Sequence, residues 1–134
     1  IIGSWCPNCL DEAEFYTSLY NKYHSEGLEV ISLAYENPLK FSEKVKSIQR
    51  LKNHFNAKYP FLIAGHASKK DVEKSLPFLK NVASFPTTIY IDKNGKIRKV
   101  HSGFYGPGTG SFFTKFSAET TQLIEDLLHE NSLN

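Results

Sequence analysis

The fold of this chain is decided by its first nine residues, IIGSWCPNC (1–9), in which a short apolar run leads into two cysteines separated by two residues. An apolar run of this kind is typical of a buried strand. Proline is well tolerated at the first position of a helix, so we predict that a helix begins at Pro7. This strand–helix junction places Cys6 at the N-terminal end of the helix and Cys9 about one turn further along.

The predicted position of Cys6 has a chemical consequence. The first backbone N–H groups of a helix have no partner within the helix, and together with the helix dipole they stabilise a negative charge. A thiol placed there has a lowered pKa and is the nucleophile of a dithiol pair. The second cysteine can attack a mixed disulfide formed on the first and release the product. We therefore expect Cys6 to be more acidic and more exposed than Cys9.

The rest of the chain alternates strand and helix patterns. The order strand, helix, strand at the start favours a parallel crossover unit. Lys93-Asn94-Gly95 between the predicted strands TTIYID (87–92) and KIRKVH (96–101) favours an antiparallel hairpin. Together these patterns predict an α/β fold with a mixed central sheet flanked by helices. We expect strands at 28–35, 59–64, 87–92 and 96–101, and helices from Pro7 to about Gly27, at 41–55, from Ser68 to a kink or early end at Pro77, and at 117–129.

Length and composition limit the classes of function. The 134 residues suit one domain, so residues 1–134 are expected to share a single core. The net charge of +2 argues against nucleic acid and anionic lipid as partners. No apolar run approaches the roughly 18 residues of a membrane span, and the five histidines lack the spacing of metal ligands. Because the opening apolar run is short for a strand, we expect the N-terminal strand, and any targeting segment, to begin upstream of Ile1.

Residues 5–9 (WCPNC) resemble the active-site motif of the thioredoxin superfamily, and more specifically that of the TlpA/ResA-type thiol–disulfide oxidoreductases of bacterial cell envelopes. Residues 84–88 (SFPTT) are similar to the cis-proline loop of that family, residues 91–97 to its hairpin, and Gly103-Phe104 to its closing turn. This resemblance covers essentially the whole chain. It implies a thioredoxin-like fold, with an extra helix and strand inserted between the active-site helix and the cis-proline loop.

The resemblance also implies a set of site residues. Cys6 and Cys9 would form a redox-active disulfide, with no other cofactor and no metal. Glu12 would exchange a proton with this pair, which its position one turn after Cys9 makes feasible. The implied catalytic residues are Cys6, Cys9, Glu12 and Pro86, and the implied substrate-contacting residues are Trp5, Pro7, Phe85 and Gly103.

Three of these residues have simpler interpretations that the sequence leaves open. Glu12 suits the first turns of a helix as a favourable acid near the positive end of the dipole. Trp5 suits a core aromatic residue. Pro86 suits an ordinary trans proline at the start of a strand, because most X-Pro bonds are trans.

The resemblance further implies partners and a location. The partners would be protein disulfides or dithiols together with a thiol electron donor. The protein would act as a monomeric reductase outside the cytoplasm, in the periplasm or cell envelope, and a membrane tether upstream of Ile1 is compatible with this role. The sequence does not decide between reductase and oxidase, because that direction depends on the relative stability of the thiolates.

Two alternative functions remain open at this stage. The first is a copper-binding metallochaperone of the Sco type, which uses cysteines separated by three residues and a distant histidine, whereas two residues separate Cys6 and Cys9. The second is a peroxiredoxin, whose peroxide pocket needs a threonine three residues before the nucleophile, where this chain has Gly3.

Overall fold

The computed structural model describes residues 1–80 and 84–131 of the chain. Helices and strands alternate along it, as the sequence predicts for an α/β fold. The helices are α1 (Pro7–Tyr23), α2 (Phe41–Phe55), α3 (Lys69–Ser75) and α4 (Ser111–His129), and the strands are β1 (Ser32–Glu36), β2 (Phe61–His66), β3 (Thr87–Ile91) and β4 (Ile97–Ser102).

The strands form two pairs that the N-terminal residues join. β1 pairs with β2 in parallel, and β3 pairs with β4 in an antiparallel hairpin. Ile2 forms a parallel bridge with Ala34 of β1, while the backbone of Ile1 exchanges hydrogen bonds of 2.8 and 3.1 Å with Thr87 of β3. The order across the fold is therefore β2, β1, residues 1–2, β3, β4, which is the mixed arrangement that the sequence predicts.

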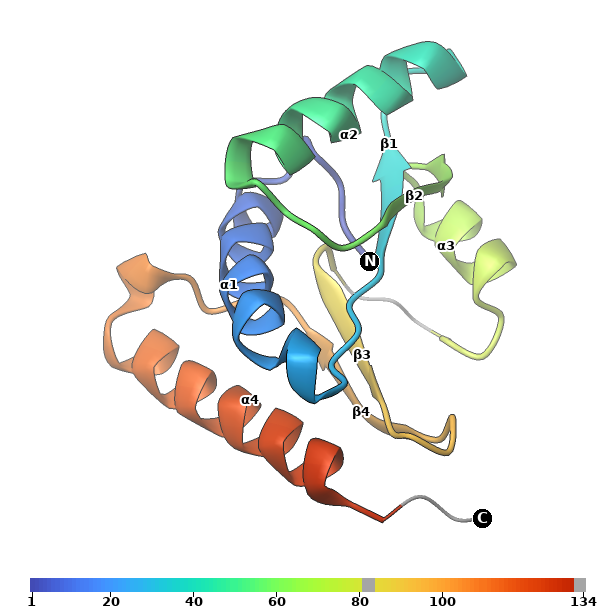
Figure 1. Ribbon diagram of the computed structural model, residues 1–134. Helices are drawn as coiled ribbons and strands as arrows, with labels where there is room; N and C mark the ends of the chain where they lie inside the picture. Colours follow the sequence, from blue (N-terminus) through green and yellow to red (C-terminus); the bar gives the residue numbers. More distant parts are fainter. Residues whose placement is uncertain (81–83, 132–134) are drawn as a thin grey trace.

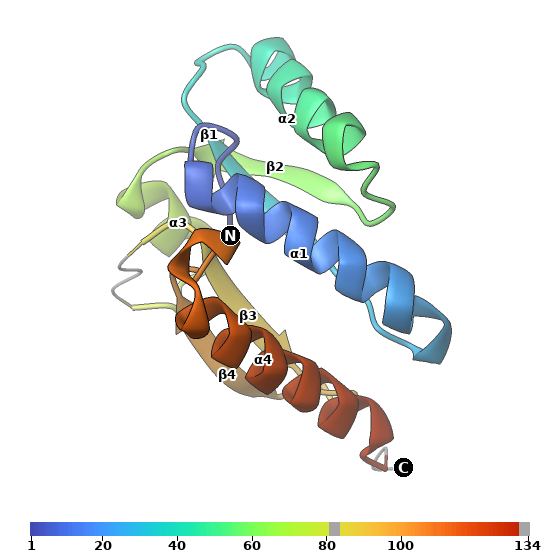
Figure 2. The ribbon, with the colours of Figure 1, turned by 90° about the vertical axis from the view of Figure 1, so that its left-hand side faces the viewer.

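The helices cover both sides of these strands. Figure 1 shows α1 and α4 together on one side and α3 on the other. Figure 2 shows α1 and α4 running side by side, and the ring of Phe15 in α1 lies 5.7 Å from that of Phe116 in α4. α2 packs against α1 and β2. One core cluster lies around Ile2, Cys9 and Ala34, and a second lies around Tyr16 of α1 and Ile124 of α4.

Most predicted elements are present with shifted ends. α1 begins at Pro7, and the chain leaves it through a short 3₁₀ turn that ends at Gly27, whose φ of 111° favours glycine. β1 and β2 begin and end later than expected, because pairing with each other sets their limits. α3 ends at Ser75, before Pro77, since proline does not continue a helix. α4 begins six residues earlier than the predicted start at residue 117, after the turn at Gly110.

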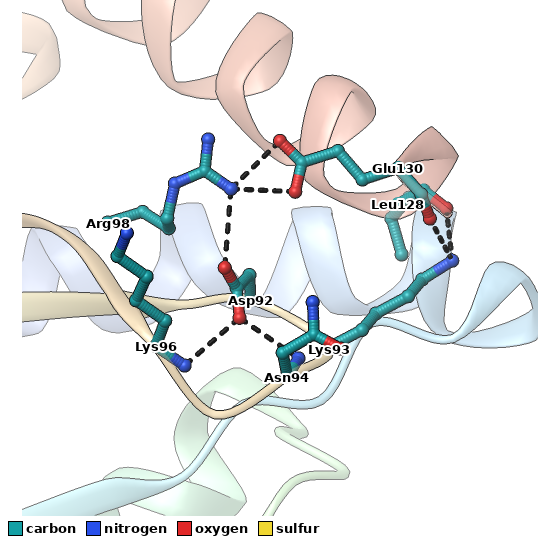
Figure 3. Close-up of polar contacts among 7 residues, drawn as sticks. All are labelled: Asp92, Lys93, Asn94, Lys96, Arg98, Leu128 and Glu130. Atoms are coloured by element: carbon teal, nitrogen blue, oxygen red, sulfur yellow. Dashed lines mark hydrogen bonds and ion pairs between the residues drawn. The ribbon is translucent and has the colours of Figure 1, made fainter. Parts of the chain in front are cut away.

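Polar contacts fasten the β3–β4 hairpin to the end of α4 (Figure 3). Within the turn, the Asp92 carboxylate accepts backbone N–H groups of Asn94 and Lys96 at 2.9 and 3.0 Å. Arg98 of β4 binds both Asp92 and Glu130, at 3.3 and 2.6 Å. These exposed contacts are individually weak, but together they fix the hairpin against the helix.

Candidate active site

The two thiols lie together at the N-terminal end of α1. Cys6 is the residue before the first helical turn, and its carbonyl accepts the backbone N–H of Cys9 at 3.0 Å. Both cysteines are free thiols. Cys6 keeps 7% of its surface exposed, whereas Cys9 keeps none. The expectation that Cys6 is the more accessible cysteine is therefore confirmed.

Cys9 is held in its protonated form. Burial raises the pKa of the Cys9 thiol above its usual range, and the neighbouring Cys6 thiol raises it further. The negative charge of Glu12 acts in the same direction. A thiol with these surroundings is a poor free nucleophile, since the reactive form is the thiolate. The site is thus asymmetric, with Cys6 as the less buried of the two thiols.

The loop that contains Pro86 lies against the dithiol. The Phe85–Pro86 peptide bond is cis, and the Cys6 thiol donates to the Phe85 carbonyl at 3.6 Å. Gly103 has a φ of +84°, and its N–H donates to the Pro86 carbonyl at 2.7 Å. Gly103 therefore holds the loop through this hydrogen bond to Pro86. The simpler interpretation of Pro86 as a trans proline is wrong.

Trp5 forms one wall beside the thiols. Its side chain is 44% exposed, so it is not a core aromatic residue. Its indole Nε1 donates to the Tyr35 carbonyl at 2.9 Å, and its ring meets the ring of Phe85 edge-on at 5.2 Å. Pro7, between the cysteines, is exposed on the same end of the helix. Together these side chains present a half-open apolar surface around Cys6.

Glu12 lies buried one turn behind Cys9. Only 5% of its surface is exposed, and its carboxylate accepts the Thr88 hydroxyl of β3 at 3.2 Å. Burial raises the pKa of Glu12 to about 7, against the smaller opposing effect of the Thr88 hydrogen bond. A carboxyl with this pKa exchanges protons near neutral pH. The structure thus brings Glu12 to the place where the resemblance puts it.

The sequence analysis missed a second buried carboxylate, Glu36, at the end of β1. Glu36 is fully buried, and it accepts both the backbone N–H of Ser4, at 2.8 Å, and the Ser4 hydroxyl. These contacts hold the turn between the N-terminal residues and Cys6. The only signal in the sequence is an acid at the end of an apolar strand, and that signal does not reveal its partner 32 positions away.

Gly3 has a steric role at the same turn. A Cβ atom built on Gly3 would lie 2.2 Å from Nε1 of Trp5, so the indole occupies the space that any larger residue needs. The residue that a peroxiredoxin requires at this position, threonine, does not fit while Trp5 keeps this orientation. The pairing of Gly3 with Trp5 therefore shapes the entrance to the dithiol.

The described residues, 1–80 and 84–131, lack two kinds of feature. They hold no group of three or more histidine, cysteine, aspartate or glutamate side chains placed to bind a metal ion. None of their helices combines the length and the apolar character needed to cross a membrane.

Comparison with known proteins adds three findings. A family model described as Redoxin matches residues 1–112. The thiol–disulfide oxidoreductase ResA of Geobacillus thermodenitrificans is 27% identical to this chain over 101 residues, which cover 75% of this chain and 51% of that protein. ResA of Halalkalibacterium halodurans is 28% identical over 103 residues, which cover 75% of this chain and 50% of that protein. The chain spans about half the length of the curated relatives it matches. The crystal structure of a Chlorobium tepidum protein, assigned as the thiol:disulfide interchange protein DsbE, is similar in fold, with a TM-score of 0.58 and 19% sequence identity. The match covers 90% of this chain and 74% of that protein's chain.

Proposed function

Because this chain belongs to the Redoxin family, we propose that it is a thiol–disulfide oxidoreductase that exchanges electrons with protein disulfides through Cys6 and Cys9. The predicted relationship to the TlpA/ResA-type branch of the thioredoxin superfamily, and the thioredoxin-like fold, are confirmed by these relatives and by the solved structure. The observation that carries the proposal is the position of Cys6 at the helix start, where it keeps a small accessible surface beside the fully buried, protonated Cys9 and the loop of Pro86.

The reaction proceeds in two exchanges. In the first, the Cys6 thiolate attacks one sulfur of a substrate disulfide, forms a mixed disulfide and releases the other sulfur as a thiolate, which takes up a proton. In the second, the Cys9 thiol loses its proton and attacks the sulfur of Cys6. The substrate leaves as its second thiolate and is protonated, and the Cys6–Cys9 disulfide is formed. Two electrons have then moved from the protein to the substrate.

Glu12 supports the second exchange. Cys9 has to lose its proton before it can attack, and the buried Glu12 carboxylate lies one helical turn away with a pKa of about 7. At neutral pH about half of the Glu12 carboxyl groups are ionised and able to accept this proton. The same carboxyl returns the proton when the dithiol is regenerated by a thiol electron donor.

The Phe85 backbone offers a place for an extended substrate. Its carbonyl faces the Cys6 thiol, and no backbone group in the described part of the chain is hydrogen-bonded to the N–H or carbonyl of Phe85. A substrate strand can pair there through its main chain, which makes recognition tolerant of sequence. Trp5 and Phe85 give the substrate an apolar surface on either side of the disulfide.

The direction and place of the reaction belong to the same proposal. We assign the protein as a reductase outside the cytoplasm, in the periplasm or cell envelope, acting as a monomer on protein disulfides. The similarity to curated ResA proteins supports this assignment.

The decisive experiment compares alkylation of two single-cysteine variants across pH. In Cys9→Ser, the remaining Cys6 should react with iodoacetamide well below pH 8, whereas in Cys6→Ser the buried Cys9 should react slowly until much higher pH. The unmodified dithiol protein should reduce insulin disulfides, and neither variant should turn over. Equal, slow labelling of both cysteines would contradict the assignment.

Each of the two alternative functions has its own test. Charge-transfer absorbance on titrating the reduced protein with copper would favour a metallochaperone. Rapid consumption of peroxide by Cys9→Ser would favour a peroxidase, which the contact between Gly3 and Trp5 argues against.

A further inference from the structure

The loop residue Phe85 is held in place by its side chain more than by its backbone. Before Phe85, the Ser84 carbonyl accepts the Thr87 hydroxyl at 2.7 Å. After it, the Pro86 carbonyl accepts the Gly103 N–H, also at 2.7 Å. Within the described part of the chain, no backbone group is hydrogen-bonded to Phe85 itself. Its main-chain groups therefore suit a substrate strand, and its position depends on what its ring contacts.

Two other aromatic residues contact this ring, so that Trp5, Tyr35 and Phe85 form an aromatic triad. The Phe85 ring meets the Trp5 ring edge-on at 5.2 Å and the Tyr35 ring edge-on at 6.0 Å. The indole Nε1 of Trp5 closes the triad, because it donates to the Tyr35 carbonyl at 2.9 Å. Edge-to-face ring pairs of this kind are favourable beyond the area that they bury. The triad therefore holds Phe85 beside the dithiol.

Tyr35 is the fixed member of the aromatic triad. It is fully buried in β1, whereas Trp5 is half-exposed. The backbone N–H of Tyr35 donates to the Ile2 carbonyl at 2.9 Å, and Tyr35 lies opposite Gly65 of β2. A Cβ atom built on Gly65 would lie 3.4 Å from Cδ1 of Tyr35, so the Tyr35 ring packs directly on that strand. An incoming substrate can move the exposed indole aside, but the buried ring keeps its place.

The contacts of Tyr35 with the triad come from its ring and not from its hydroxyl. Within the described residues, the buried Tyr35 hydroxyl has no hydrogen-bond partner. A buried hydroxyl without a partner lowers stability, so phenylalanine is an acceptable replacement at this position. Loss of the hydroxyl and loss of the ring can therefore be tested separately.

We propose that Tyr35 is a positioning residue for thiol–disulfide exchange, whose ring holds the Phe85 backbone beside Cys6 so that an extended protein substrate can pair with it. This role rests on the proposed function, since it concerns how a substrate strand is received at the dithiol. A protein disulfide, which uses the Phe85 backbone, then depends on Tyr35. A small disulfide has no main chain to pair, so its reaction with Cys6 does not.

The test compares two substrates of the reduced protein: insulin, with dithiothreitol as the electron donor, and the small disulfide dithiobis(nitrobenzoic acid). Tyr35→Leu removes the ring and keeps apolar bulk. It should lower kcat/KM for insulin about tenfold and change the rate constant for the small disulfide by less than about twofold, because misplacement of Phe85 affects only the substrate that pairs with it. Tyr35→Phe, which loses only the hydroxyl, should keep both rates. Tyr59→Leu, the loss of a similarly buried tyrosine from the second core cluster, should keep the ratio of the two rates.

Phe85→Leu removes the same ring contact from its other side, and it carries the test if Tyr35→Leu does not fold. Because either change breaks this contact, the double variant should reduce insulin no more slowly than Phe85→Leu alone. Multiplication of the two single losses in the double variant would show that the rings act independently and would overturn the role of Tyr35.

The positioning role is also refuted if Tyr35→Leu slows both substrates equally, or if it leaves insulin reduction unchanged. Loss of activity in Tyr35→Phe to the level of Tyr35→Leu would assign the effect to the hydroxyl and contradict the inference. If the wild-type protein reduces neither substrate, the oxidoreductase function itself fails, and the inference with it. The two failures are therefore distinguishable.

Discussion

Replacing Glu12 with glutamine should stabilise the protein at high pH and not at low pH. The carboxyl has an ordinary pKa of 4.5 in the unfolded chain, and burial raises it to about 7 in the folded one. Ionised Glu12 is therefore disfavoured by folding, and its unfavourable contribution appears as pH rises from 4.5 to 7. A difference of 2.5 pKa units corresponds to about 3 kcal/mol of unfolding free energy. Glutamine has the same shape and no charge to bury.

The measurement is urea denaturation of wild type and Glu12→Gln, both reduced, at intervals from pH 4 to pH 8.5. The quantity of interest is the difference in unfolding free energy between the two proteins at each pH. Groups whose titration does not depend on Glu12 contribute equally to both proteins, so their effects cancel in this difference. Below pH 4.5 the two free energies should nearly coincide, and above pH 7 the variant should be more stable by about 3 kcal/mol. Glu14→Gln, an exposed change on the same helix, is the control and should track wild type. A difference that stays flat within about 1 kcal/mol from pH 4 to pH 8.5 would refute the reasoning.

Two further changes test the turn before the dithiol. Ser4→Ala leaves an oxygen of the buried Glu36 carboxylate without a donor, so it should cost about 1–3 kcal/mol of stability in urea denaturation, and unaltered stability would be inconsistent with the contact. Gly3→Thr places a side chain where the indole of Trp5 lies, so the indole should move into solvent. Trp5 is the single tryptophan of the chain, so its fluorescence reports this directly: we expect a red shift, and a spectrum that superimposes on that of wild type would argue against the packing.

The sequence by itself determined those parts of the molecule that depend on near neighbours in the chain. Pro7 after an apolar run starts a helix because its φ and its missing N–H suit that position, and this places Cys6 and Cys9 on adjacent turns. Asn94-Gly95 closes the β3–β4 hairpin through its turn geometry. The alternation of these local patterns was sufficient for the α/β class, and the cysteine motif together with residues 84–88 was sufficient for the family.

Only the tertiary structure decided how the dithiol is surrounded. The Ser4–Glu36, Tyr16–Tyr90 and Glu12–Thr88 contacts join residues 32, 74 and 76 positions apart. No local periodicity encodes such pairs, because they form when helices and strands pack and leave buried polar groups that need partners. Burial also changed the chemistry of residues that the sequence had identified. It keeps Cys9 protonated and brings the pKa of Glu12 to about 7, and both effects arise from desolvation that exists only in the folded molecule.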